Sequence, residues 1–133
     1  IVPPTYPNDT GQISIEQFLK TPLILREDGS GTRKLLAKAL ERHGYTLNDL
    51  NVVTEMTTID AIKSAVEAGL GHAVVPRLAV RKEAYLGTLK VLTIEGMKMP
   101  LDFNIMYPHK KVLTPTAKRF IKFLTDPDEN ILC

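Results

Sequence analysis

The chain has 133 residues, of which 44% are hydrophobic and 24% are charged, and this is the composition of one soluble globular domain with a buried core. Its 17 Lys and Arg residues against 15 Asp and Glu residues give a net charge of +2, which is too balanced to indicate a nucleic-acid-binding surface. The single cysteine, Cys133, excludes a disulfide framework and a cysteine-based zinc site, and no apolar run approaches the roughly 20 residues of a membrane span.

The predicted elements begin after an extended, proline-rich entry segment, and because the sequence starts at Ile1 rather than Met we expect a segment of a longer chain. The spacing Ser14-Ile15-Glu16-Gln17 is that of a capping box and predicts a short helix over 14–19. Apolar runs predict strands at 22–26, 51–54, 71–76, 89–94 and 101–106. Helical spacing predicts three longer helices, at 32–43, 58–68 and 115–124, and a short helix at 78–84.

Strands and helices therefore alternate along the chain with short connections. This order predicts an α/β fold around a largely parallel sheet flanked by helices. The predicted core faces of the three longer helices consist of side chains three and four residues apart: Leu35, Leu36, Ala39, Leu40 and His43; Ile59, Ile62, Ala65 and Val66; and Ala117, Phe120, Ile121 and Leu124.

The sharpest local feature is the loop Asp28-Gly29-Ser30-Gly31-Thr32-Arg33, which joins the first predicted strand to the first long helix. Its two glycines permit a tight turn, Ser30 and Thr32 add hydroxyl groups, and the helix contributes unpaired N–H groups and the positive end of its dipole. Such a junction is suited to a carboxylate, sulfate or phosphate. It matches neither the P-loop nor the dinucleotide-binding pattern, and a plain helix cap is the alternative interpretation.

Thr57 and Thr58 stand at a second junction between a strand and a helix, where Thr57 and Asp60 have the spacing of a capping box with Asp in place of Glu. Simple capping explains them on local evidence. In a parallel α/β sheet, however, the loops that follow the strands share one edge, and ligands bind there. Two hydroxyl-bearing helix N-termini at one edge therefore predict a ligand site more strongly than either does alone.

The other polar residues carry weaker signals. Arg26 and Arg33 are placed to counter an anionic ligand, or alternatively to pair with carboxylates such as Glu27 or Asp28. His72 lies in an apolar run and is either a core residue or a residue that faces a cleft. The histidines have no metal-ligand spacing, and no residue set suggests nucleophilic or acid/base catalysis, so we predict no metal, no cofactor and no enzyme activity.

Several motifs follow one another in a fixed order. The segment from Leu23 to Arg33 is followed by Thr58-Ile59-Asp60-Ala61-Ile62-Lys63, Ala68-Gly69-Leu70-Gly71, Val74-Val75-Pro76 and Leu113-Thr114-Pro115-Thr116-Ala117. Together they resemble the second lobe of the C-terminal effector (substrate)-binding domain of LysR-type transcriptional regulators, over about 1–124. The resemblance implies a fold like that of type 2 periplasmic binding proteins, with two α/β lobes and a cleft between them. Residues 1–100 are then the second lobe, and 101–133 supply a return strand and C-terminal helix toward a first lobe absent from this chain.

The same resemblance implies that Ser30, Gly31, Thr32, Thr57 and Thr58 line the cleft and bind a small anionic effector, whereas His72 stands where an aliphatic residue is usual. It also implies a cytoplasmic regulator that forms a homodimer or homotetramer and binds DNA through a winged helix-turn-helix not present in this chain. No contact with a membrane is expected. The alternative function is the solute-binding component of a transport system for a small anion, because that class shares the fold and the same kind of junctions.

Overall fold

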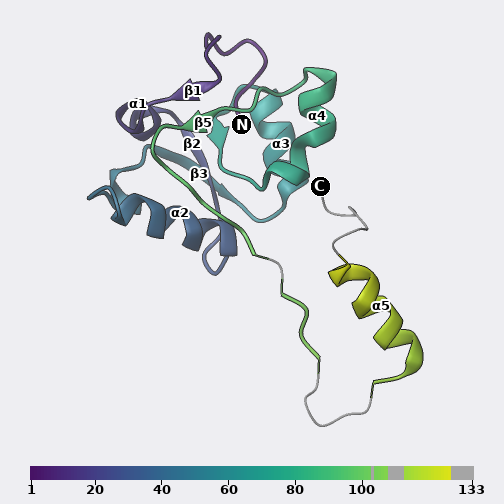
Figure 1. Cartoon of the computed structure of the whole chain (residues 1–133). Coiled ribbons are helices and arrows are strands. Elements are labelled where there is room, and N and C mark those ends of the chain that lie inside the picture. The colour runs from purple at the N-terminus through teal and green to yellow at the C-terminus, as the bar shows by residue number, and fades with distance from the viewer. Residues whose placement is uncertain (103, 108–112, 127–133) are drawn as a thin grey trace. The chain divides into compact units, whose positions relative to one another are not determined.

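The computed structural model describes residues 1–102, 104–107 and 113–126 of the chain (Figure 1). The chain divides into two compact units, Ile1–Leu101 and Asp102–Cys133. The first unit contains a three-stranded sheet of β2 (Leu23–Arg26), β3 (Val52–Met56) and β4 (His72–Ala73), in the order β3-β2-β4. Both neighbours pair with β2 in parallel, which confirms the predicted α/β fold with a parallel sheet.

Four α-helices surround this sheet in the first unit: α1 (Ile15–Lys20), α2 (Gly31–Glu41), α3 (Ile59–Glu67) and α4 (Arg81–Leu86). The predicted capping box is confirmed at α1, where the Ser14 hydroxyl accepts from the backbone N–H of Gln17 and the Gln17 side chain accepts from the N–H of Ser14, both at 3.2 Å. Two further parallel strands, β1 (Gln12–Ile13) and β5 (Thr93–Ile94), pair with each other.

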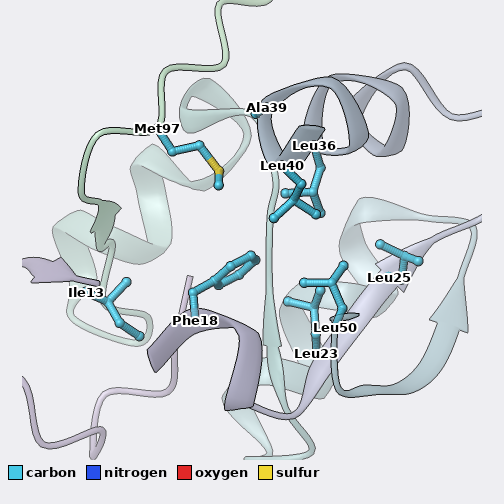
Figure 2. Packing of buried hydrophobic residues seen from close by; sticks show 9 residues of the cluster. All are labelled: Ile13, Phe18, Leu23, Leu25, Leu36, Ala39, Leu40, Leu50 and Met97. Carbon is cyan, nitrogen blue, oxygen red and sulfur yellow. The ribbon is translucent and has the colours of Figure 1, made fainter. Parts of the chain in front are cut away.

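The core has two parts because successive side chains of β2 point to opposite faces of the sheet. Leu23 and Leu25 pack with α1 and α2, in a cluster made of Ile13, Phe18, Leu23, Leu25, Leu36, Ala39, Leu40, Leu50 and Met97 (Figure 2). Ile24 packs on the other face with α3, in a cluster made of Ile24, Ile62, Ala65, Val66, Ala73 and Leu89. Helices α2 and α3 therefore cover opposite faces of the sheet.

Three predicted strands are shorter than expected or missing. Of 71–76 only His72–Ala73 join the ladder, since Pro76 has no N–H to donate and the chain turns there into a 3-10 helix, Arg77–Val80. Of 89–94 only Thr93–Ile94 form a strand, besides one antiparallel bridge between Val2 and Lys90. The described residues of 101–106, which are 101–102 and 104–106, form no strand. An extended segment becomes a strand only beside a partner, and hydropathy alone does not identify that partner.

The ends of two predicted helices also differ from expectation. The helix predicted at 78–84 is a 3-10 turn that continues into α4, which ends at Gly87 in the left-handed conformation with φ +72°. The helix predicted over 32–43 ends at Glu41, so His43 does not share the face of Leu36 and Leu40 as predicted. It lies exposed beyond the C-terminal end of that helix, with Nδ1 2.9 Å from the carbonyl oxygen of Ala39. The imidazole thus binds one of the carbonyl oxygens that the end of the helix leaves without an N–H partner, and this explains why His43 does not join the apolar face.

The second unit contains α5 (Pro115–Thr125), which begins as predicted, with the Thr114 hydroxyl accepting from the N–H of Ala117 at 3.2 Å. No residue of α5 is buried, and Phe120 on its predicted core face is 60% exposed. Ala117, Ile121 and Leu124, the other residues of that predicted face, are partly exposed. In the part of the chain that the structure describes, no helix combines the length and the apolar character that crossing a membrane requires.

Candidate functional site

The carboxyl ends of the three parallel strands meet at one edge of the sheet. Strand β2 continues into the loop before α2, and β3 continues into Thr57 and Thr58 before α3. The backbone N–H of Glu27 donates to the carbonyl oxygen of Met56 at 3.3 Å, so the two loops start side by side. The structure therefore brings all five predicted ligand residues, Ser30, Gly31, Thr32, Thr57 and Thr58, to the same edge.

The strand order places a crevice between β2 and β4 at this edge. After β2 the chain continues into α2, which lies on one face of the sheet. After β4 it continues into α4, which contacts α3 on the other face through an ion pair: Lys63 Nζ lies 2.9 Å from Oε1 of Glu83. Divergent connections of this kind mark the usual binding position in open α/β sheets. A small, open hollow runs along β2 and reaches this edge, and it is lined by Leu23, Ile24, Leu25, Arg26, Thr32, Arg33, Leu36 and Val74.

Ser30 is the residue before the first turn of α2, and its side chain caps nothing. The residue is only 8% exposed, and its hydroxyl has no hydrogen-bond partner among the described residues, although its backbone N–H donates to the carbonyl oxygen of Glu27 at 3.2 Å. Among the described residues, the one buried side-chain oxygen without a partner is Oε2 of Glu83, so the Ser30 hydroxyl is reached by solvent. It is therefore free to bind a ligand beside the N–H groups at the start of the helix.

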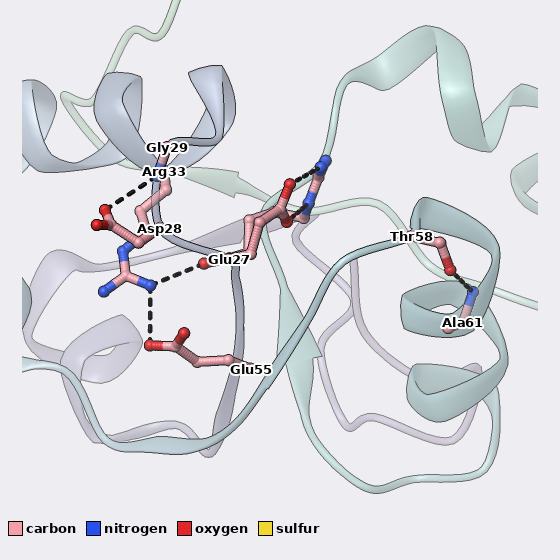
Figure 3. Close-up of polar contacts among 8 residues, drawn as sticks. Glu27, Asp28, Gly29, Arg33, Glu55, Thr58 and Ala61 are labelled. Carbon is pink, nitrogen blue, oxygen red and sulfur yellow. Dashed lines mark hydrogen bonds and ion pairs between the residues drawn. The ribbon is translucent and has the colours of Figure 1, made fainter.

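The two threonines differ from each other in role. Thr58, not Thr57, is the cap of α3, since its hydroxyl accepts from the backbone N–H of Ala61 at 3.3 Å (Figure 3). The predicted capping box between Thr57 and Asp60 is wrong, because α3 starts one residue later and Asp60 pairs with Lys63 at 2.9 Å instead. Capping uses only an acceptor lone pair of Thr58, so its O–H remains able to donate to a ligand.

Both arginines of this edge are paired with carboxylates. The Arg26 guanidinium holds Glu27 through two bonds of 2.7 and 2.8 Å, and this contact lowers the pKa of Glu27 and raises that of Arg26. Arg33 Nη1 lies 2.8 Å from Oε1 of Glu55 (Figure 3), while the Asp28 carboxylate accepts the N–H of Gly29 at 2.9 Å. Of the two interpretations from the sequence, the structure supports pairing. An anion at this edge would therefore meet mainly neutral donors.

His72 lies at the start of β4, away from the carboxyl edge, and the residue is 9% exposed. Its ring meets the ring of Tyr6 edge to face, with the two centroids 4.7 Å apart. Burial lowers the pKa of His72. Of the two sequence interpretations, the core one holds, because the imidazole packs the entry segment against the sheet.

We expect the protein to lose stability as the pH falls below the ordinary histidine value of 6.5, because the unfolded chain then binds a proton that folded His72 resists. Thermal unfolding between about pH 7.5 and about pH 5 measures this loss. In His72→Phe an aromatic ring still contacts Tyr6, and the decrease in stability per pH unit should be smaller. All other titrating groups are the same in both proteins, so the difference between the two slopes isolates His72. Equal slopes would contradict the prediction.

No group of three or more His, Cys, Asp or Glu side chains within the described ranges could hold a metal ion. The sequence reasoning missed Val74 and Glu55. Val74 reaches the edge through the pairing of β4 with β2, and Glu55 reaches it through that of β3 with β2. A long-range pairing of this kind leaves no signal near either residue in the sequence.

Comparison with known proteins gives a consistent result. The family description "LysR substrate binding domain" matches residues 1–127. An uncharacterized HTH-type transcriptional regulator of Methanocaldococcus jannaschii is 34% identical, over 94% of this chain and 43% of its own length. The HTH-type transcriptional activator CmpR of Synechocystis sp. is 33% identical, over 90% of this chain and 38% of its own length. The chain therefore spans less than half the length of these relatives.

A solved structure shows the same fold. The regulatory domain of CcmR from Synechocystis PCC6803, in complex with 2-PG, superposes with a TM-score of 0.75 at 22% sequence identity. The match covers 98% of this chain and 62% of that chain. The two chains therefore share a fold over the matched part.

Proposed function

Because the chain belongs to the LysR substrate binding domain family, we propose that it senses a small anionic effector on behalf of a transcriptional regulator that binds DNA. The observation that carries the proposal is the Ser30 hydroxyl, which has no partner among the described residues, is open to solvent and lies directly before the first turn of α2. Hydrogen-bond donors that are held in place before the ligand arrives bind an anion with little further loss of conformational entropy.

The effector site in this proposal consists of Ser30, Gly31, Thr32, Thr57 and Thr58. The hydroxyls of Ser30, Thr57 and Thr58 donate to the anion, and so do the orphan N–H groups of the first turn of α2. Arg26 and Arg33 stay with their carboxylates, so the affinity depends on hydrogen bonds more than on net charge. Binding regulates because the effector has different affinities for two states of the protein.

The proposed organisation makes residues 1–100 the second lobe of the effector domain and 101–133 a return segment toward the first lobe. The support for it is that the match covers only 62% of the CcmR domain, which extends well beyond the matched part. The relatives named above are HTH-type regulators, which supports DNA binding through a winged helix-turn-helix in another part of the protein. We further propose a cytoplasmic homodimer or homotetramer without enzyme activity.

The solute-binding alternative is not favoured, since the two relatives compared above are transcriptional regulators. Thermal shift of the full-length protein with 2-PG, inorganic phosphate, sulfate and acetate tests the proposed function. 2-PG is included because it occupies the related CcmR domain. A ligand at 100 times its Kd adds about 2.7 kcal/mol to the free energy of unfolding. No shift with any of these compounds would contradict the proposal of an anion sensor.

Ser30→Ala is expected to weaken binding of the anion by about tenfold, because one hydrogen bond to a charged group is lost. Thermal stability should stay close to that of the wild type, since this hydroxyl caps no N–H. Ser64→Ala is the matched control, because Ser64 lies exposed within α3. Calorimetric titration measures both affinities. Unchanged affinity in Ser30→Ala and in Thr32→Ala would exclude the site.

A further inference from the structure

Arg33 lies in the first turn of α2, directly after the loop that carries the proposed ligand residues. Its Nη1 donates to the main-chain oxygen of Arg26, the last residue of β2, at 3.0 Å, and to Oε1 of Glu55 in β3 at 2.8 Å (Figure 3). A single guanidinium nitrogen therefore joins the start of α2 to both of these strands near their carboxyl ends.

Few other bonds fix the loop between β2 and α2. The N–H of Ser30 donates to the oxygen of Glu27, and the N–H of Gly29 donates to the carboxylate of Asp28, and both bonds lie within the loop. Only the N–H of Glu27 reaches β3, where it meets the oxygen of Met56 at 3.3 Å. In the described residues, the position of the loop relative to the sheet therefore depends strongly on the contacts of Arg33.

The partners of Arg33 occupy one nitrogen of its guanidinium and balance its charge. The two protons of Nη1 are both used, and the carboxylate of Glu55 compensates the positive charge. The side chain is largely buried, at 20% exposure. A planar guanidinium held on two acceptors from two strands has little freedom, which is the property of a group that positions others.

We propose that Arg33 is the positioning residue of the effector site. It holds the first turn of α2 against the strand ends, so that the Ser30 hydroxyl and the N–H groups of Gly31 and Thr32 converge on one anionic group. The presence of an anionic ligand rests on the proposed function, whereas the contacts by which Arg33 holds α2 do not. Donors held in place before binding give tighter complexes, because the cost of ordering them is met on folding.

Three variants of the full-length protein test the inference. Arg33→Met removes the guanidinium, Arg33→Lys keeps the charge without the planar fork, and Lys34→Met removes a charge from the same turn, where Lys34 has no side-chain bond among the described residues. In the ligand-free protein, amide exchange at Glu27 and Ser30 should rise by about tenfold in Arg33→Met. Affinity for 2-PG and inorganic phosphate should fall by about tenfold, with Arg33→Lys between the extremes and Lys34→Met within about twofold of wild type.

The two readouts separate the possible results. Unchanged amide exchange in Arg33→Met overturns the inference, and so does lost affinity without faster exchange, since Arg33 would then contact the ligand itself. An equal loss of affinity in Lys34→Met overturns it as well, because net charge would then explain the effect. If wild-type protein binds neither probe, the proposed function fails, and amide exchange alone decides the role of Arg33. Should Arg33→Met not fold, Glu55→Gln replaces it, with a smaller rise in exchange expected.

Discussion

Leu40→Ala is expected to lower the free energy of unfolding by about 3 kcal/mol, because it removes a large side chain from the centre of the core. Leu40 is 0% exposed and lies near the end of α2, within the cluster that also contains Phe18, Leu36 and Leu50 (Figure 2). The lost contacts and the cavity both contribute, since rigid neighbours from α1 and β2 close it only in part.

Leu86→Ala is the matched control for this prediction, because the same atoms are removed from a leucine that is 59% exposed at the end of α4. It should change stability by less than about 0.5 kcal/mol. Urea unfolding of both variants measures the difference, provided that the dependence on urea concentration stays the same. Equal losses in Leu40→Ala and Leu86→Ala would mean that the α2 cluster is not the core of this unit.

The sequence predicts the elements of this fold well where the signal is local. Ser14 and Gln17 identify the start of α1, and Thr114 with Pro115 identifies the start of α5, since capping depends on residues three positions apart. The apolar spacing around Leu36 and Leu40 identifies α2 and its buried face. These features need no knowledge of the rest of the molecule.

Strand limits are predicted less well, because a strand exists only where another strand pairs with it. Leu89 is buried as an apolar residue in a predicted strand should be, yet the ladder starts only at Thr93. Leu101 and Ile105 alternate with polar residues as in a strand and are exposed without one. Burial and strand pairing are separate properties, and an apolar pattern by itself specifies neither of them.

The candidate site also has parts that local sequence predicts and a part that depends on the pairing of distant strands. The loop around Ser30 and the junction at Thr58 are visible in the sequence, because a strand, a turn with glycine or threonine, and a helix follow one another there. Their arrival at one edge follows from parallel pairing. The contact between Arg33 and Glu55 spans 22 residues along the chain and depends on the strand order, which local patterns do not specify.

Gly71→Ala is expected to destabilise the protein by about 2 kcal/mol, because the added methyl group meets backbone rather than a movable side chain. A Cβ at Gly71 would lie 2.9 Å from the carbonyl oxygen of Pro22 and 3.2 Å from Cγ1 of Ile24. That same oxygen accepts from the N–H of His72 at 2.7 Å. To make room, β4 must move away from β2, and this movement weakens the hydrogen bond that begins their pairing.

The same substitution at Gly31 should have the opposite sign. A Cβ there would meet nothing within 4 Å, and the residue has helical conformation at the first position of α2, so Gly31→Ala should raise stability by about 0.5 kcal/mol. Thermal unfolding compares the two variants, and amide exchange at His72 shows whether β4 has separated from β2. A loss of similar size in both would contradict the steric argument. Opposite signs would show that close approach of β4 to β2, rather than backbone conformation, requires glycine at position 71.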